Sequence, residues 1–173
     1  MVEVERYACG RNLNTSFVII DSKSIKNTDT AQSKGYDSGK KISGIKLHIA
    51  VDILGLPHAI HITKANETDR NGAIFMAITN FNNLCNVQNV LADSSYSGEN
   101  FEKAMRHILG CSVEVVKKSD LHTFQVIPKR WVVERTFAWL EKSRRLWKNC
   151  ERHLHTSKQM TVLALLHLIL KRF

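Results

Sequence analysis

Short apolar runs and longer amphipathic stretches alternate along this chain, and their spacing predicts its secondary structure. Short runs rich in β-branched residues are typical of strands, whereas apolar residues three and four positions apart indicate helices. We predict strands at residues 17–20, 46–53, 58–63, 89–92 and 112–116. Helices are predicted at residues 72–81, 98–109, 130–147 and 157–171.

Turn and cap residues mark the ends of several of these elements. Gly55 and Pro57 lie between the second and third strands and predict a hairpin. Asp69 is a candidate N-cap for the first helix, and Gly110 is expected to end the second. The polar stretch 22–41, rich in Ser, Lys, Asp and Gly, is predicted to be a loop.

The order of the elements predicts an α/β fold. Three consecutive strands precede a strict alternation of strands and helices, which favours a mixed sheet with antiparallel hairpins first and parallel crossovers after. The sequence contains no internal repeat or linker. We therefore expect one domain over residues 1–173, with residues 1–15 irregular.

Composition bounds the class of protein. With 173 residues and 43% apolar content, the chain can bury a substantial core. Its four scattered cysteines show no C-x-x-C pairing, which suits a reducing compartment better than a disulfide framework or a zinc site. The start lacks a secretory signal, and the longest apolar run, 162–170, is too short to span a bilayer. We expect an intracellular protein.

Charge is distributed unevenly. Residues 1–116 carry 12 basic and 12 acidic side chains, whereas residues 117–173 carry 13 and 4, so the last third holds the whole net charge of +9. A solvated helix surface is the ordinary explanation of such a run. Aromatic residues interleaved with the basic ones favour a nucleic-acid partner instead.

Three acidic residues lie in or next to apolar runs: Asp21, Asp93 and Glu134. A carboxylate in such a place is costly unless it is compensated, and hard divalent cations bound by oxygen are a natural compensation. Asp21 and Asp93 each follow a predicted strand, and the carboxyl ends of neighbouring strands meet at the switch point of an α/β sheet. Glu134 lies about 100° round the predicted helix from Val133, at the edge of its buried stripe. If the three converge, they form a metal site for phosphodiester chemistry.

Other interpretations of these acids stay open. Glu141 has nearly the same azimuth as Glu134 but lies roughly 10 Å further along the helix axis, in a less apolar environment. Glu134 could simply pair with Arg130, one turn away. Asp93 could cap a turn, and a structural role is expected for Asp52, which precedes the hairpin turn.

Four segments carry a resemblance to a known family: residues 18–26 (VIIDSKSIK), 46–73, 89–101 (NVLADSSYSGENF) and 124–152. The chain resembles the DDE transposases of bacterial insertion sequences, of the "insertion sequence five" group within the wider "insertion sequence four" superfamily. The resemblance implies a ribonuclease H-like fold, a mixed five-stranded sheet flanked by helices. It also implies that Asp21, Asp93 and Glu134 are the catalytic triad.

The wider superfamily places Tyr, Arg and Lys around the third acid. Arg130 matches the Arg position. Ile127 and Glu141 stand at the Tyr and Lys positions, and Lys142 follows one residue later.

The resemblance further implies the reaction and its partners. Asp21, Asp93 and Glu134 would bind two Mg²⁺ ions, with Mn²⁺ as a substitute, for cleavage of double-stranded DNA at the element ends and strand transfer into target DNA. Such a protein would work at the nucleoid in the bacterial cytoplasm, alone or as a homo-oligomer. The expected phosphate contacts are Lys40, Lys41, Arg130, Arg135, Lys142, Arg144, Arg145 and Lys148.

The sequence departs from the family pattern before Asp21. Only 20 residues precede it, where family members usually have a helical DNA-binding region. An upstream-frame DNA-binding polypeptide is therefore a further expected partner. The alternatives are a truncated DNA-binding remnant without autonomous transposition and a metal-dependent nuclease on the same fold.

Overall fold

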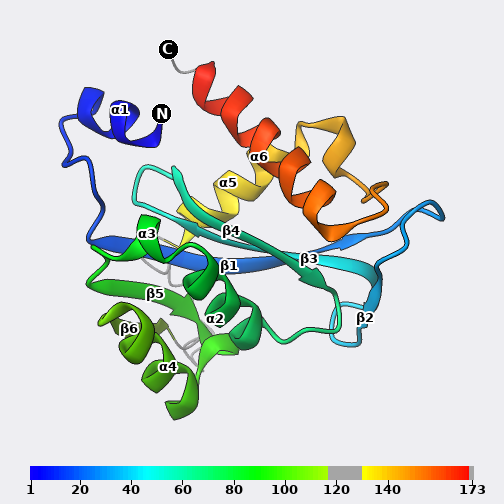
Figure 1. Cartoon of the computed structure of the whole chain (residues 1–173), viewed down its shortest axis with the longest axis horizontal. Helices are drawn as coiled ribbons and strands as arrows, with labels where there is room; N and C mark the ends of the chain where they lie inside the picture. Colours follow the sequence, from blue (N-terminus) through cyan, green and yellow to red (C-terminus); the bar gives the residue numbers. More distant parts are fainter. Residues whose placement is uncertain (117–129, 172–173) are drawn as a thin grey trace, which may run out of the picture.

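A mixed β-sheet runs through the middle of the molecule, and helices lie on both of its faces (Figure 1). The computed structural model describes residues 1–116 and 130–171. The strands in these ranges are β1 (Phe17–Lys26), β2 (Gly35–Asp37), β3 (Ile42–Val51), β4 (Pro57–Lys64), β5 (Asn89–Asp93) and β6 (Ser112–Val116). The helices are α1 (Val2–Ala8), α2 (Asp69–Thr79), α3 (Phe81–Leu84), α4 (Glu99–Leu109), α5 (Trp131–Glu141) and α6 (Leu154–Leu170), with short 3₁₀ helices η1 (Ser94–Tyr96) and η2 (Arg144–Leu146).

Strand β1 lies at the centre of the sheet. It runs antiparallel to β3 on one side and parallel to β5 on the other. Strand β4 pairs antiparallel with β3, and β6 pairs parallel with β5. The predicted arrangement, with antiparallel hairpins first and parallel crossovers after, is confirmed. All five predicted strands are present, and the short β2, paired with the start of β3, is an additional strand that the sequence did not predict.

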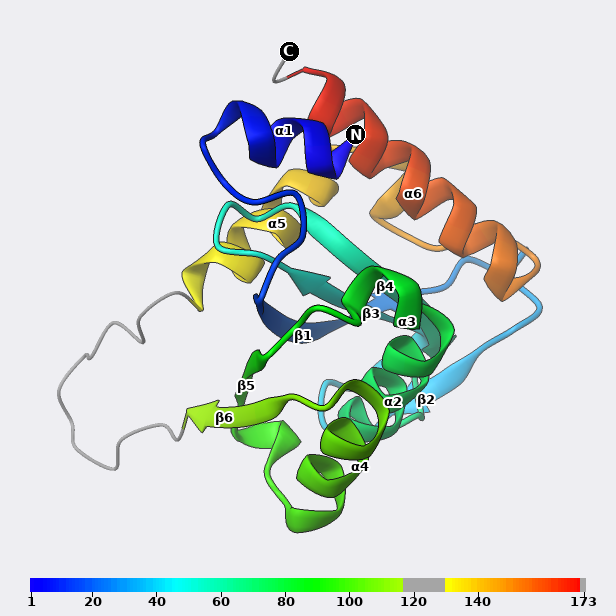
Figure 2. The same ribbon diagram turned by 60° about the vertical axis from the view of Figure 1, so that its left-hand side comes forward.

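Successive side chains of the central strand enter two different cores, because strand residues alternate between the faces of a sheet. Val18 and Ile20 pack with residues of α2 and α4, whereas Ile19 packs with residues of α5 and α6. Figure 2 shows these two helix pairs on opposite sides of the sheet. We call the two sides the α2 face and the α5 face.

The structure confirms one of the two predicted helix caps. Gly110 ends α4 in the left-handed conformation, at φ 68°, as predicted. Helix α2 is capped by Thr68, whose hydroxyl accepts the backbone N–H of Asn71 at 3.2 Å. The prediction that Asp69 is the N-cap is therefore wrong. Asp69 is the first residue of the helix, and its carboxylate pairs with Lys46 of the sheet.

The predicted loop at residues 22–41 is wrong at two places. Strand β1 continues through Lys26, and residues 35–37 form β2. The backbone of β1 pairs with β3 from Ile19 to Lys26, so the neighbouring strand continues the ladder through the polar segment. Ser22 and Ser24 are buried there because their hydroxyls find carboxylate partners from distant segments.

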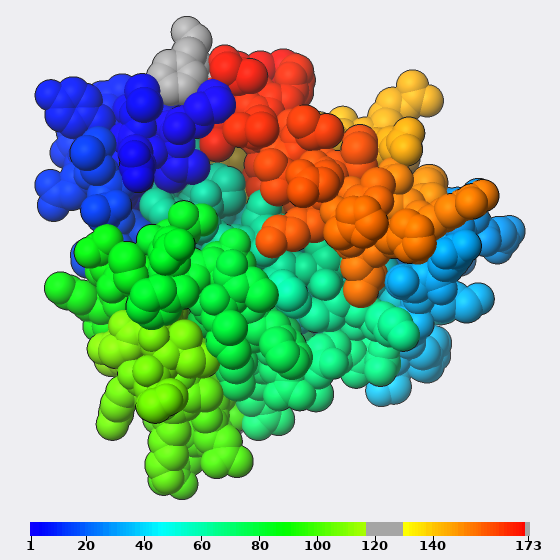
Figure 3. Space-filling model, in the orientation of Figure 1, coloured from blue at the N-terminus to red at the C-terminus, as the bar shows by residue number. Residues whose placement is uncertain are grey.

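Several helices differ from the prediction in length or existence. Helix α2 spans residues 69–79 instead of 72–81, and α3 is an additional helix. Residues 2–8 form α1, where irregular structure was expected. Helix α5 ends at Glu141 instead of continuing to residue 147, and α6 begins at Leu154 instead of residue 157. The N-terminal α1 lies beside the end of α6 in both the ribbon and the space-filling views (Figures 1 and 3). Within the described ranges, none of the helices has the length and apolar character needed to cross a bilayer.

Asp52 holds α1 and the β3–β4 turn together. Its carboxylate is fully buried and accepts the backbone N–H groups of Leu54 and Leu56 at 2.9 and 3.0 Å. Arg6 of α1 and His58 of β4 pair with the other oxygen. Burial alone would raise the pKa of Asp52, but the hydrogen bonds from His58, Leu56 and Arg6 lower it below the usual value. The contacts of Asp52 are therefore those of a structural residue, as expected.

Replacing Asp52 by alanine should destabilise the fold strongly. The variant leaves Arg6 buried without its carboxylate and removes two turn hydrogen bonds, so we expect a loss of about 3–5 kcal/mol in the free energy of unfolding. Urea denaturation at pH 7 measures the loss. The exposed Asp29 provides the control, because Asp29→Ala should change the free energy of unfolding by less than about 0.5 kcal/mol. Equal effects of the two substitutions would contradict the structural role of Asp52.

Candidate active site

Asp21 and Asp93 lie side by side on the α5 face of the sheet. Strands β1 and β5 pair in parallel up to Ile19 and Leu91, and both of these side chains belong to the core of the α5 face. Two residues further along each strand, the side chain returns to the same face. The predicted placement at a strand end holds for Asp93, the last residue of β5, but is wrong for Asp21, which lies in the middle of β1.

The positive charges near Asp21 only partly compensate the burial of its carboxylate. Its pKa is raised from 3.8 to about 6, mainly by burial and further by the neighbouring charge of Asp93. The Ser22 backbone N–H donates to Asp21 Oδ1 at 2.7 Å and opposes this rise, as do the more distant charges of Arg130 and Lys40. A carboxylate in such a place favours the approach of a further cation.

The Asp93 carboxylate is held at both oxygens. Its Oδ1 accepts the backbone N–H of Ser95 at 2.9 Å and the Ser95 hydroxyl at 2.5 Å, so Asp93 caps the turn into η1. Its Oδ2 lies 3.2 Å from Nη2 of Arg130. One oxygen of Asp93 therefore caps the turn, as the turn-capping interpretation predicts, and the other oxygen lies against Arg130 at the start of α5.

Arg130 stands between the second and third acids. It directly precedes α5, and its Nε lies 3.7 Å from Oε1 of Glu134, an ion pair too long for a hydrogen bond. The Glu134 side chain is 59% exposed. The simple pairing of Glu134 with Arg130 is thus present in the structure. Across residues 1–116 and 130–171, no three His, Cys, Asp or Glu side chains are grouped closely enough to hold a metal ion.

The residues present nevertheless fit a divalent cation in their chemistry. Asp21 and Asp93 offer carboxylate oxygens on one face of adjacent strands, and oxygen is the ligand that Mg²⁺ prefers. Burial, and further the charge of Asp93, raise the pKa of Asp21, and a bound cation would stabilise its charged form. Glu134, on α5, is linked to Asp93 through Arg130, which pairs with both acids.

Glu141, the rival third acid, points elsewhere. Its side chain is 58% exposed and pairs with Lys23 of β1. Lys23 and Glu141 line a cavity of about 520 Å³ between β1 and the end of α5. The other residues lining this cavity are Ile25, Ala138, Lys142, Leu146 and Trp147.

The β2–β3 hairpin carries two of the predicted DNA contacts, Lys40 and Lys41, and brings Lys40 to the backbone next to Asp21. Lys40 Nζ lies 3.4 Å from the carbonyl oxygen of Ser22, the residue after Asp21. Lys41 adopts the left-handed conformation, at φ 54°, in the hairpin turn and is exposed. Lys40 is thus the hairpin cation beside the acids.

Arg135 has a structural environment. Its guanidinium lies 4.5 Å from the ring centre of Trp131 and 4.6 Å from that of Trp139. It also donates to the carbonyl of Leu54 at 3.1 Å, which ties α5 to the β3–β4 turn. Cation–π contacts and this hydrogen bond leave Arg135 less suited to phosphate binding than the exposed cations.

The remaining predicted DNA contacts surround η2 at one edge of the molecule. Lys142, Arg144 and Lys148 are exposed, and Arg145 pairs with Glu151 at 2.8 Å. Asn149 anchors this segment, because its backbone N–H donates to the carbonyl of Lys26 at the end of β1. Arg130, the last of the predicted contacts, touches the acids, and Ile127 lies outside the described residues.

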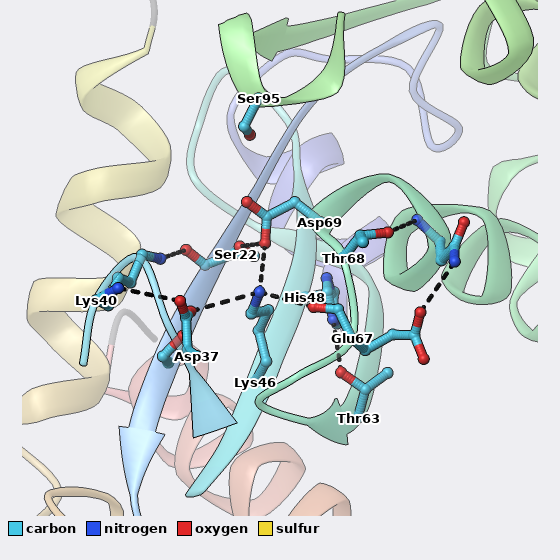
Figure 4. Close-up of polar contacts among 12 residues, drawn as sticks. Ser22, Asp37, Lys40, Lys46, His48, Thr63, Glu67, Thr68, Asp69 and Ser95 are labelled. Carbon is cyan, nitrogen blue, oxygen red and sulfur yellow. Dashed lines mark hydrogen bonds and ion pairs between the residues drawn. The ribbon is translucent and has the colours of Figure 1, made fainter. Parts of the chain in front are cut away.

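Sequence reasoning missed a polar cluster behind Asp21, on the α2 face. Figure 4 shows Ser22, Asp37, Lys46 and Asp69 in contact there. The alternation of Ser22 and Ser24 with bulkier residues was the available signal, because a period of two indicates a strand. The cluster itself joins segments far apart in the sequence, which no local pattern reveals.

The sheet order and the neighbouring acids define the class of fold, which is ribonuclease H-like. The chain resembles a chain in the cryo-EM structure of the simian T-cell lymphotropic virus intasome in complex with PP2A regulatory subunit B56 gamma (TM-score 0.55, 17% identity, covering 88% of this chain and 47% of that one). It also resembles the catalytic core domain of BIV integrase (TM-score 0.53, 12% identity, covering 88% of this chain and 82% of that one). At these identities the likeness concerns the fold alone.

The sequence identifies the family to which the chain belongs. Residues 12–169 match the family described as "Transposase DDE domain", and the chain belongs to this family. A relative from Burkholderia cepacia, "Putative transposase for insertion sequence element IS402", is 34% identical over 116 residues, which cover 63% of this chain. The match covers 54% of that relative, so the chain spans about half of its length. The family generally uses divalent metal ions.

The raised pKa of Asp21 predicts that Asp21→Asn stabilises the protein at pH 7. A carboxyl whose pKa is raised on folding contributes stability that is present below about pH 4 and is lost as the pH rises through about 6. The asparagine variant avoids this loss, so we expect a gain of about 1–3 kcal/mol at pH 7 and none near pH 4. Urea denaturation at both pH values, without added divalent metal, measures the difference.

Asp69→Asn is the matched control, and its effect on stability at pH 7 should have the opposite sign. Burial acts to raise the pKa of Asp69, but hydrogen bonds from Ser22 and Lys46 lower it below the usual value. Its contribution is therefore present at pH 7 and is lost on acidification, so this variant should be less stable than the parent at pH 7. An Asp21→Asn variant no more stable than the parent at pH 7 would contradict the described environment of Asp21.

Proposed function

We propose that this chain is the catalytic core of an insertion-sequence transposase, which cuts DNA phosphodiester bonds and joins the released 3′ end to target DNA. The observation that carries the proposal is the pair Asp21 and Asp93 on one face of the central strands, with Glu134 across from them. Membership in the transposase DDE family supports it, as does the relative from an insertion sequence.

Asp21, Asp93 and Glu134 are the metal ligands in this proposal. The preferred ions are two Mg²⁺, with Mn²⁺ as a substitute, because all three side chains offer carboxylate oxygens. Bound there, the ions supply an activated water or 3′ hydroxyl as nucleophile and stabilise the departing oxygen. Glu134, exposed and joined to Arg130 only by the 3.7 Å contact, can turn toward the two aspartates at little cost.

Arg130 and Lys40 hold the scissile phosphate in this proposal. Arg130 now lies against the oxygens of Asp93 and Glu134, and a cation bound by those acids would compete with it. The guanidinium would then be available to a phosphate, which it recognises through paired N–H donors. Lys40 contacts the carbonyl of Ser22, the residue after Asp21, and would contact the same strand of DNA.

The flanking DNA backbone runs, in the proposal, over the exposed cations around η2 and along the β2–β3 hairpin. These cations are Lys41, Lys142, Arg144, Arg145 and Lys148. Arg135 is excluded from the path, since its contacts with Trp131, Trp139 and Leu54 hold α5 in place. A second copy of the chain, or a further DNA-binding polypeptide, is the proposed partner in pairing two element ends at the bacterial nucleoid.

Glutamine substitutions at two positions of α5 test the third ligand. Glu134→Gln should lower Mg²⁺-dependent nicking of a supercoiled plasmid that carries the element ends at least about 100-fold, as should Asp93→Asn. Glu141→Gln is the matched control, because Glu141 lies on the same helix, has similar exposure and pairs with Lys23. It should retain nicking within about threefold of the parent chain.

The same assay separates the proposal from its rivals. Retained nicking in Asp93→Asn, or loss in Glu141→Gln but not in Glu134→Gln, would refute the ligand assignment. Strand transfer of a pre-cleaved end distinguishes a transposase from a metal-dependent nuclease on the same fold. Binding of DNA without nicking in either Mg²⁺ or Mn²⁺ is the result expected of an inert remnant.

The salt dependence of DNA binding tests the proposed path. Arg144→Ala should reduce the slope of log K against log salt concentration by about 0.9, the value for one lost phosphate contact. Fluorescence anisotropy with a short duplex at several salt concentrations measures the slope. Arg106→Ala is the control, because Arg106 is exposed on α4, on the other side of the sheet. Equal slopes for Arg144→Ala and the parent would exclude this contact.

A further inference from the structure

The peptide group after Asp21 is held from the back of the sheet. Ser22 is buried on the α2 face, and its hydroxyl donates to Asp69 Oδ1 at 2.7 Å. Its backbone N–H donates forward, to Oδ1 of Asp21, at 2.7 Å. Its carbonyl accepts from Lys40 Nζ at 3.4 Å. Ser22 therefore connects the Asp21 carboxylate to a partner on the opposite face.

That partner belongs to a buried ion cluster centred on Lys46 (Figure 4). The Lys46 side chain is 7% exposed, and its ammonium lies 2.9 Å from Asp69 Oδ1 and 3.5 Å from Asp37 Oδ2. It also donates to the carbonyl of Glu67 at 2.8 Å. Asp37 in turn accepts the backbone N–H of Lys40 at 3.0 Å. The cluster thus ties β1, β3, the hairpin and the start of α2 together.

Stability alone does not explain such a cluster. Replacing a buried ion pair by well-packed apolar residues is often neutral or stabilising. The other half of the α2 face is apolar, as Val18, Ile20 and Ala50 demonstrate. The polar half begins at Ser22, the first residue after Asp21. A role in orienting the adjacent acid accounts for this position.

We propose that Asp69 and Lys46, acting through Ser22, are positioning residues that fix the orientation of the Asp21 carboxylate for cation binding. The inference rests on the proposed function, since it takes Asp21 as a metal ligand. Outer partners that orient a ligand commonly contribute 10–100-fold to metal affinity or activity. Asp69 would act here from the far side of the strand, without touching the ion or the DNA.

Two serines of β1 provide a matched test. Ser22 and Ser24 are equally buried, at 7% exposure, and each hydroxyl donates to a carboxylate of the same cluster, at 2.7 Å for Ser22 and 2.6 Å for Ser24. Only Ser22 also contacts Asp21. Ser22→Ala and Ser24→Ala should therefore lower the melting temperature by similar amounts. We expect Ser22→Ala alone to weaken Mn²⁺ binding to the isolated chain, and to lower kcat for nicking, by about 10-fold or more.

A second pair of variants tests the same proposal at the two carboxylates that accept from these serines. Asp69→Asn keeps the size of the side chain but weakens its hold on Ser22 and Lys46, and Asp37→Asn does the same for Ser24 and Lys46. Asp69→Asn should weaken Mn²⁺ binding and lower kcat with little change in KM for DNA. Asp37→Asn should leave the Mn²⁺ affinity within about twofold of the parent. Isothermal titration calorimetry of the full chain without DNA gives the affinities.

Asp21→Asn, measured in parallel, separates the two levels of the proposal. Unchanged Mn²⁺ binding and nicking in Asp21→Asn would overturn the proposed function itself. If Asp21→Asn loses both while Ser22→Ala matches Ser24→Ala and Asp69→Asn matches Asp37→Asn, only the positioning role is overturned. Weakened Mn²⁺ affinity confined to Ser22→Ala and Asp69→Asn, at the stability of their controls, supports it.

Discussion

The burial of the Asp21 carboxylate, next to the carboxylate of Asp93, is the constraint around which this site is organised. Asp21 and Asp93 come from neighbouring parallel strands, and pairing with β3 and β6 holds the backbone of each acid in place. Burial and the charge of Asp93 hold the pKa of Asp21 near 6. The surrounding cations, Arg130 at 3.2 Å from Asp93 and Lys40 near Ser22, compensate this charge only in part. A site in this state favours a divalent cation, which agrees with the metal use of the family.

The two faces of the central strand β1 have different roles. One face carries the candidate active site, and the other packs against α2 and the Lys46 cluster. Odd-numbered residues of β1 face α5, where Ile19 enters the core and Asp21 enters the site. Even-numbered residues face α2, where Val18 and Ile20 pack and Ser22 and Ser24 join the Lys46 cluster. One strand thus carries an apolar anchor at its start and a polar anchor at its end. Asp21 lies between these two anchors.

Much of this arrangement could be predicted from the sequence. Asp21 and Asp93 each follow an apolar run, and the order of the strands places those runs next to each other. Helical periodicity placed Glu134 at the edge of the buried stripe of α5, and the structure has it exposed beside Val133, which is fully buried. The orientation of the Glu134 side chain could not be predicted, because Arg130 forms ion pairs with both Asp93 and Glu134.

The failures at β1 and at α1 share one physical cause, which is long-range contact. The polar continuation of β1 resembles a loop because the partners of Ser22 and Ser24, the carboxylates of Asp69 and Asp37, lie elsewhere in the sequence. The short helix α1 depends on the buried pair between Arg6 and Asp52, 46 positions apart. The contacts of Arg135 with Trp131 and Trp139, one helical turn on either side, are local, and the DNA-binding role expected of Arg135 stays a prediction.

The central claim is most directly tested by anomalous diffraction from crystals of the chain soaked in Mn²⁺. The account predicts a peak within about 2.0–2.3 Å of carboxylate oxygens of both Asp21 and Asp93, with Glu134 turned toward it. Strong Mn²⁺ peaks only at other residues, with Arg130 still against Asp93, would contradict it.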